Sequence, residues 1–191
     1  MTKTKYIDIH AGLIDKCQVG DRRSQFEIYK LYYKAMYNIC LRIVKHKNDA
    51  EDIAQEGFIS AFTNISSFTG NVTFGAWLKR IIINKSLDYL KKNKPNMISI
   101  EDVNISENNE EETDYTKYEI KRIKEAVSKL PDGYRVVTSL YLFEGYDHDE
   151  IGEILGITSS ASRSQLTRAK KKVIELLENQ NQYGKTKRVF Q

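Results

Sequence analysis

The sequence has little cysteine and proline and no long apolar run. Two cysteines, Cys17 and Cys40, and two prolines occur among 191 residues. Two isolated thiols argue against a disulfide framework or a cysteine zinc site, so we expect both to be buried. The first residues, MTKTKYIDIHAG, lack the apolar core of a signal peptide, and no stretch is apolar enough to span a bilayer. We therefore expect a cytoplasmic protein that does not insert into a membrane.

Further absences limit the chemistry. His10, His46 and His148 have no second ligand at helical or loop spacing, so the sequence predicts no metal site. The sequence also lacks a glycine-rich phosphate loop and any run of alternating polarity that would predict strands. It also lacks a metal-binding carboxylate cluster and a nucleophile beside a base. We therefore expect no catalytic residues, no cofactor and no enzymatic activity.

Charge is distributed unevenly along the chain. The net charge is +4, but residues 101–114, EDVNISENNEEETD, contain acids and no bases. The positive charge therefore lies in the flanking segments, which favours a polyanionic partner. Residues 93–116 also have no sustained period and contain Pro95, so we predict a flexible linker there, between domains at 11–92 and 117–180.

Apolar residues recur at helical spacing in both domains, which predicts an all-α fold. A core helix over 21–45 is predicted from a stripe formed by Phe26, Tyr29, Tyr33, Tyr37, Cys40 and Val44. A second helix, capped by Asn48, is predicted from an apolar face formed by Ala50, Ile53, Ala54, Gly57, Phe58 and Ala61. A third is predicted from Phe74 to about Lys92, with Leu78, Ile82 and Tyr89 on one side and Trp77, Arg80, Asn84 and Lys91 on the other. In the second domain, helical spacing links Ile120, Ile123, Val127 and Leu130, stops at Pro131, and resumes through Val136, Val137, Leu140 and Tyr141.

Residues 147–178 have the pattern of a helix-turn-helix. Asp147 and Glu150 have capping-box spacing, Gly156 can end the first helix, and Thr158 or Ser159 can cap the second. Inward positions of the pair are predicted for Ile151, Ile154, Leu155, Leu166, Ala169, Val173 and Leu176. Outward positions, suited to phosphates and base edges, are predicted for Ser160, Arg163, Ser164, Gln165, Arg168 and, further along, Lys171. A helix pair with no role in DNA binding would have the same turn, and Lys170 to Lys172 could instead complement the helix dipole.

Four segments, taken together, resemble one family. GDRRSQFEIYKLYY, DAEDIAQEGFISAF, FGAWLKRIIINKSLDYLKK and LPDGYRVVTSLYLFEGYDHDEIGEILGITSSASRSQLTRAKKKV, in this order and with an acidic linker, resemble bacterial RNA polymerase sigma factors of the extracytoplasmic-function (ECF) group. The resemblance covers residues 11–180. It implies a region 2 domain at 11–92 for polymerase docking, minus-ten recognition and melting, a linker at 93–116, and a region 4 domain at 117–180 for minus-thirty-five recognition.

The resemblance also implies partners. These are the clamp helices of the largest subunit of core RNA polymerase, the flap of the second-largest subunit, promoter DNA, and an anti-sigma factor, whether soluble or membrane-bound. The implied function is to bind core polymerase, direct it to specific promoters and assist promoter opening.

Candidate site residues follow by position. Asp49, Asp52, Gln55 and Glu56 would meet the clamp helices, although acids early in a helix also favour its dipole. Arg80, Asn84, Lys91 and Lys92 suit contacts with the minus-ten element. The loop 66–73 would accept a base flipped out of the duplex, with Phe68 and Trp77 as its aromatic wall, although Trp77 could equally be a core aromatic.

Two residues depart from the family pattern, and two other functions remain open. Ser162 stands where relatives usually have a branched apolar residue, which weakens an expected core contact. Gln165 stands where many relatives have arginine. Glutamine favours adenine whereas arginine favours guanine, so the promoter sequence of relatives cannot be transferred to this chain. The alternatives are a stand-alone, dimeric helix-turn-helix regulator and a nucleic-acid-processing enzyme. The acidic helix followed by a basic one argues against the regulator, and a nuclease and helicase assay with magnesium would test the enzyme.

Overall fold

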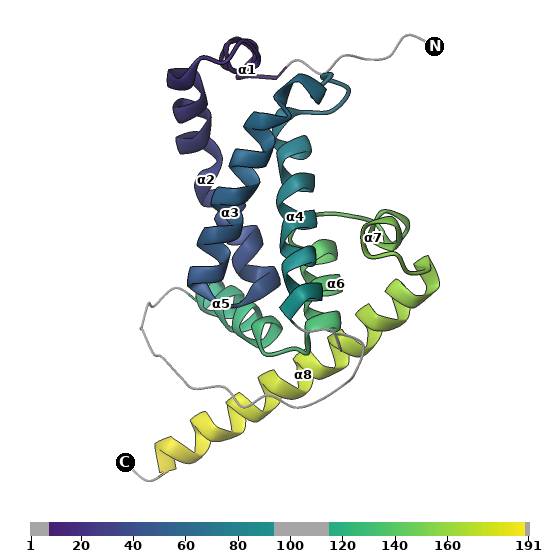
Figure 1. Cartoon of the computed structure of the whole chain (residues 1–191). Helices are drawn as coiled ribbons and strands as arrows, with labels where there is room; N and C mark the ends of the chain where they lie inside the picture. Colours follow the sequence, from purple (N-terminus) through teal and green to yellow (C-terminus); the bar gives the residue numbers. More distant parts are fainter. Residues whose placement is uncertain (1–7, 94–114, 190–191) are drawn as a thin grey trace. The chain divides into compact units, whose positions relative to one another are not determined.

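A computed structural model of the chain describes residues 8–93 and 115–189 (Figure 1). Every regular element in these ranges is a helix, which confirms the predicted all-α class. The chain divides into two compact units, residues 1–95 and 96–191. The linker predicted at 93–116 lies almost entirely outside the described residues.

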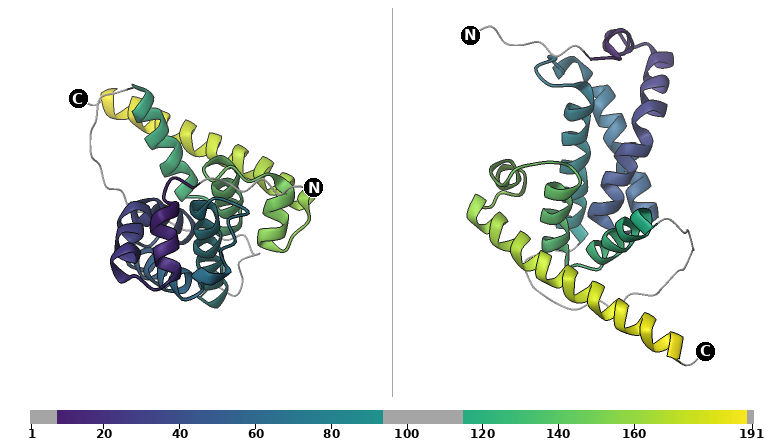
Figure 2. Two further views of the ribbon diagram at one scale, coloured as in Figure 1. Left: turned by 90° about the horizontal axis from the view of Figure 1, so that it is seen from above. Right: turned by 180° about the vertical axis from the view of Figure 1, so that it is seen from behind.

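The first unit is a bundle of three long helices with a short helix at one end. α1 (Ala11–Gln18) is followed by α2 (Arg22–Val44), α3 (Lys47–Thr63), the 3-10 turn η1 (Ile65–Ser67) and α4 (Phe74–Asn93). α2, α3 and α4 pack side by side, and α1 contacts α2 and η1 (Figure 2). The largest fully buried side chains of this unit come from α2 and α4: Ile28, Ile43, Val44, Phe74, Leu78, Ile82, Ile83 and Leu90.

The predicted apolar face of α3 is confirmed in full, because all six of its residues are buried. Gly57, at the centre of this face, packs closely against α4. A Cβ at that position would lie 2.3 Å from Cδ1 of Ile82. Glycine therefore lets the helix that carries the acidic residues pack tightly against the helix that carries the basic ones.

The predicted cap of α3 is wrong. The helix begins at Lys47, with His46 as the flanking residue, so Asn48 lies inside the first turn. The chain reverses at Lys45, whose φ of 72° is in the left-handed region. This reversal starts α3 earlier than the side-chain pattern indicates.

The predicted stripe of α2 is partly wrong. Cys40 and Val44 are buried, but Phe26 is 58% exposed, and Tyr29, Tyr33 and Tyr37 are half-buried. The buried arc instead includes the aliphatic residues Ile28, Met36, Ile39 and Ile43. α2 contacts α1, α3 and α4, so packing against three helices sets which of its residues are buried. The aromatic side chains lie at the edge, where the Tyr29 ring packs 4.9 Å from that of Phe58.

The second unit consists of α5 (Tyr115–Ser128), α6 (Asp132–Leu142), α7 (His148–Leu155) and α8 (Ser159–Val189). α8 packs against the other three helices. The core of this unit contains Val127, Leu130 and Ala169. Ile120 and Ile123 are 48% and 39% exposed, so the apolar face of α5 is buried only in its second half.

Arg135 anchors the junction of α5 and α6. It is 1% exposed, pairs with Asp132 and donates to the carbonyl of Leu130 at 3.2 Å. Burial lowers the pKa of its guanidinium, and the neighbouring Asp132 opposes that shift. The charge is therefore buried with its partners, as a buried arginine requires.

The helix-turn-helix has the predicted local structure. Asp147 accepts hydrogen bonds from the backbone N–H groups of Asp149 and Glu150, and the Glu150 carboxylate accepts from the N–H of Asp147 at 2.9 Å. Gly156 ends α7 with a φ of 69°. Of the two candidate caps for α8, Thr158 is the one whose hydroxyl accepts from a helical N–H, that of Ala161 at 3.1 Å.

None of the helices in the described ranges is long and apolar enough to cross a membrane.

Candidate nucleic-acid and protein interfaces

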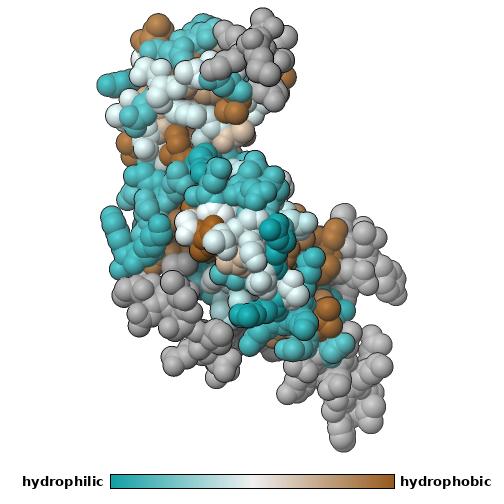
Figure 3. Space-filling view, turned by 90° about the vertical axis from the view of Figure 1, so that its right-hand side faces the viewer, coloured by the Kyte–Doolittle hydropathy of each residue, from teal (hydrophilic) through white to brown (hydrophobic). Residues whose placement is uncertain are grey.

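The first turns of α8 present a polar face to solvent. Its exposed residues are Ser160, Arg163, Ser164, Arg168 and Lys171, and Gln165 is half-buried. Leu166 and Ala169 are buried on the opposite side, while Val173 and Leu176 are half-buried. The predicted division of this helix into an inner and an outer face is therefore confirmed for its first turns, except at Gln165, which lies between the two faces. Hydrophilic side chains predominate in the view of Figure 3, where hydrophobic ones form separate patches.

Ser162 does not weaken the packing of α8 as we expected from its position. It is fully buried, and its Oγ lies 2.9 Å from Nδ1 of His148. The His148 ring in turn stacks on Tyr141, with centroids 4.9 Å apart. A polar bond between α7 and α8 thus replaces the apolar contact, and His148 has a packing role.

The outer face of α3 carries acidic residues and one exposed isoleucine. Asp52, Gln55 and Glu56 are exposed, and Ile59, one turn further on, is 66% exposed. Sequence reasoning missed Ile59, although its position three and seven residues after Glu56 and Asp52 placed it on this face. An exposed isoleucine beside hydrogen-bonding groups is typical of a protein-binding surface.

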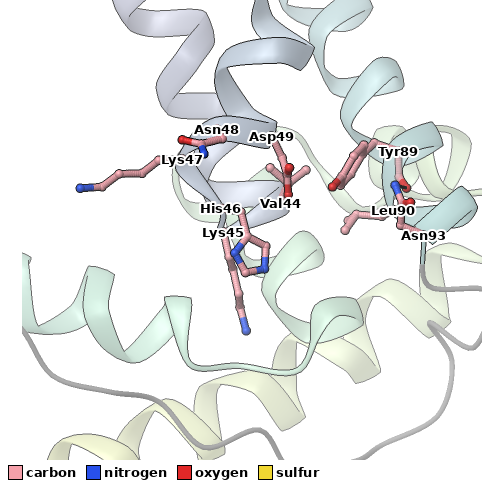
Figure 4. Close-up of a pocket in the computed structure, with 9 residues that line it drawn as sticks. All are labelled: Val44, Lys45, His46, Lys47, Asn48, Asp49, Tyr89, Leu90 and Asn93. Carbon is pink, nitrogen blue, oxygen red and sulfur yellow. Dashed lines mark hydrogen bonds between the residues drawn. The ribbon is translucent and has the colours of Figure 1, made fainter.

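Asp49 differs from these three residues in its burial and in its bonding partner. It is half-buried and accepts a hydrogen bond from Tyr89 of α4, which is the main reason that the pKa of Tyr89 is raised. Both side chains line an open pocket of about 680 Å³ between the ends of α2 and α4 and the start of α3 (Figure 4). Asp49 therefore ties α3 to α4, a role that the sequence did not reveal.

Phe68 and Trp77 lie together at the start of α4. Their ring centroids are 5.5 Å apart, and each lies 5.5 Å from the ring of Phe74, which is fully buried. Phe68 and Trp77 themselves are half-buried. Each ring therefore packs on the core and also has exposed surface available for stacking.

The polar side of α4 continues from this aromatic pair. Arg80 is half-buried, and Asn84, Lys91 and Lys92 are exposed. Trp77, Arg80, Asn84 and Lys91 follow one another at three-, four- and seven-residue steps, so they share a face. The exposed Asp88 lies on the same face and interrupts its positive charge.

The described residues contain no cluster of three or more potential metal ligands. Both cysteines are buried, as predicted. Burial raises the pKa of the Cys40 thiol to about 11, which makes it unreactive.

Comparison with known proteins identifies both units. Residues 28–95 match Sigma-70 region 2, and residues 120–173 match Sigma-70 region 4. The chain is 31% identical over 169 residues to the ECF RNA polymerase sigma factor SigW of Bacillus subtilis, covering 82% of this chain and 90% of the relative. It is 29% identical over 183 residues to the ECF RNA polymerase sigma-E factor of Haemophilus influenzae, covering 90% and 94%.

Two solved structures have a similar fold. CnrH, in complex with the cytosolic domain of CnrY, matches with a TM-score of 0.57 and 23% identity over 90% of this chain and 99% of that one. The sigma factor RpoE of Bartonella quintana, in complex with the anti-sigma factor NepR, matches with a TM-score of 0.56 and 22% identity over 80% and 95%.

Proposed function

The chain belongs to the ECF group of RNA polymerase sigma factors, and we propose that its two units divide promoter recognition between the surfaces described above. It is a sigma factor that directs RNA polymerase to promoters. The observation that supports this division is that each unit has its own polar, DNA-compatible helix face, one on α4 and one on α8. A stand-alone regulator would need only the second.

For the first unit, we propose that Asp52, Gln55 and Glu56 contact the basic clamp helices of the largest polymerase subunit. Ile59, one turn further along α3, adds an apolar contact to this surface. Asp49 belongs to the same surface by position, but its bond to Tyr89 makes it mainly a support for α3.

We further propose that α4 reads the downstream promoter element. Phe68 and Trp77 offer stacking surface to an unpaired base, which is worth roughly 1–3 kcal/mol per base. Arg80, Asn84, Lys91 and Lys92 lie further along the helix and suit contacts with phosphates and base edges.

In the second unit, we propose that α8 enters the major groove of the upstream element. Arg163, Ser164 and Gln165 lie in its first turns, where base contacts are made, while Ser160, Arg168 and Lys171 suit phosphates. We propose that the two domains comprise residues 11–92 and 117–180 and that residues 93–116 form the linker between them.

Further properties follow from membership of the family. Sigma factors are initiation factors and not enzymes, and we infer that this chain has no catalytic activity, because polymerase performs the phosphoryl transfer. We also infer that it acts in the cytoplasm, where polymerase and chromosome lie. We infer further that the flap of the second-largest polymerase subunit holds its second unit. Finally, we infer that an anti-sigma factor restrains it. The sigma factor RpoE of Bartonella quintana is described in complex with the anti-sigma factor NepR.

The experiment that tests this proposal is transcription in vitro with purified core polymerase on genomic fragments, followed by mapping of start sites. We expect defined starts that depend on the added chain and share an upstream and a downstream element. Binding to DNA without core polymerase, as a dimer on palindromic sites, would favour the stand-alone regulator instead.

A further inference from the structure

Residues 66–73, which comprise the end of η1 and the loop that leads to α4, are mostly exposed. Ser66, Ser67, Thr69 and residues 71–73 are exposed, and Gly70 has a φ of 73°. The loop's internal side-chain bonds include one from Nδ2 of Asn71 to Oγ1 of Thr69 at 2.8 Å. Apart from Phe68 and Gly70, every residue of this segment is exposed, and an exposed segment needs support from outside to keep one conformation.

Residues from α1 and the segment before it hold both ends of this loop. At the first end, Nε2 of Gln18 donates to the carbonyls of Phe68 at 3.2 Å and Ile65 at 3.5 Å. At the second end, Oδ2 of Asp8 accepts from the backbone N–H of Phe74 at 2.8 Å. These bonds join residues 47 to 66 positions apart in the chain.

Asp8 acts as a helix cap supplied from a distance. The N–H of Phe74 is among the first of α4, and such groups have no partner within the helix. The nearby Thr73 hydroxyl accepts from Ala76 at 3.3 Å, so Asp8 satisfies a different donor. The other oxygen of Asp8 accepts from the N–H of His10 at 2.9 Å, which fixes the carboxylate.

Ring contacts reinforce this attachment. His10 packs edge-on against Tyr32, with centroids 5.8 Å apart, and Tyr32 packs against Phe74 at 5.5 Å. Phe74 is the buried ring on which Phe68 and Trp77 rest. The segment from Asp8 to Gln18 therefore contacts the frame of the aromatic pair as well as the ends of the loop.

We propose that Asp8 and Gln18 are positioning residues for promoter opening, which hold the loop 66–73 ready to receive an unpaired base. This inference rests on the proposed role of that loop and adds to it. A loop that is already ordered loses less conformational entropy when it captures a base, so capture is tighter. Neither residue needs to touch DNA.

The test measures how holoenzyme binds a single-stranded oligonucleotide with the non-template sequence of the downstream element, taken from the mapped promoters. We expect Asp8→Ala and Gln18→Ala each to weaken this binding about fivefold, equivalent to about 1 kcal/mol. Affinity for core polymerase and for the upstream duplex should stay unchanged. Asp8→Asn retains an acceptor oxygen and should restore most of the binding, whereas Gln18→Glu retains the size but loses the donor and should not.

Two further variants separate the possible failures. Asp15→Ala removes an exposed acid from α1 that has no such bond to the loop, and it should bind like the wild type. Phe68→Ala tests the loop itself. If Phe68→Ala weakens binding but the Asp8 and Gln18 variants do not, the positioning role is wrong and the proposed function stands. If Phe68→Ala also leaves binding unchanged, the role proposed for the loop is wrong and the positioning role fails with it.

Discussion

Adding one methyl group at Gly57 should push α3 and α4 apart. The new Cβ would lie 2.3 Å from Cδ1 and 3.4 Å from Cγ1 of Ile82. Carbon atoms in contact are normally about 3.5–4.0 Å apart, so Cδ1 must move by more than about 1 Å. Ile82 is fully buried, so its neighbours must move as well.

The sign of the effect depends on two opposing contributions. Alanine favours a helix interior over glycine by about 1 kcal/mol, whereas overpacking a core costs about 1–3 kcal/mol. We therefore expect Gly57→Ala to lower the free energy of unfolding by about 1 kcal/mol. Ile82→Val, which removes Cδ1, should cost about 0.5–1.5 kcal/mol alone. In the double variant the new methyl fills part of that space, so the two changes should couple favourably by about 1–2 kcal/mol.

Urea titration followed by tryptophan fluorescence measures this directly. Trp77 is the only tryptophan in the sequence and lies in the first unit, so its signal reports on the unfolding of that unit. Gly12→Ala is the matched control, because an added Cβ there meets nothing within 4 Å. If Gly57→Ala is as stable as this control, or if the double variant is additive, our account of the α3–α4 contact is refuted.

Three further predictions concern the two interfaces and a buried thiol. Changing Asp52 and Glu56 together to lysine should lower affinity for core polymerase tenfold or more, about 1.4 kcal/mol, because like charges then face the basic clamp. The circular dichroism spectrum should stay helical, and an unchanged affinity in a pull-down titration would contradict the docking surface. Arg163→Ala should relax preference at one or two base pairs by about 1–3 kcal/mol, whereas Lys171→Ala should weaken all sequences alike and reduce the salt slope by about one. Selection from a randomised upstream element tests this pair, and the opposite pattern would mean that α8 is rotated. Cys40, whose pKa burial raises from 9.0 to about 11, should resist alkylation at pH 8 until urea unfolds the chain. Rapid alkylation of the folded chain would show instead that the thiol is accessible. Because the unfolded thiol ionises at lower pH than the folded one, Cys40 should lower the free energy of unfolding as pH rises from 9.0 toward 11.

Some elements could be predicted from the sequence because their determinants are local. The buried face of α3 repeats at three- and four-residue steps, and a helix that packs along one side needs no more information than that. The caps around the turn of the helix-turn-helix join residues two or three positions apart, at Asp147 and Thr158. The family motifs have the same local character, which is why the resemblance could be recognised before the fold was known.

Helix orientation was harder to predict where several neighbours compete. The aromatic stripe of α2 indicated a buried Phe26, but contacts with three helices centre the buried arc on Ile28 and Ile43 instead. At Ser162, residue type alone predicted a weak contact. Burial without a partner would be costly, and the partner, His148, lies on another helix.

The amino-acid sequence by itself determined the helical class, the helix-turn-helix, and the residue types available to polymerase and DNA, because periodicity and capping act within a few residues. Only the tertiary structure decided which of these residues support one another. The bond of Asp8 to Phe74, that of Gln18 to Phe68, and the contact of Gly57 with Ile82 join positions that share no local pattern. Such pairs arise only when whole helices have packed, since the distance between two side chains then depends on every residue that sets the helix spacing.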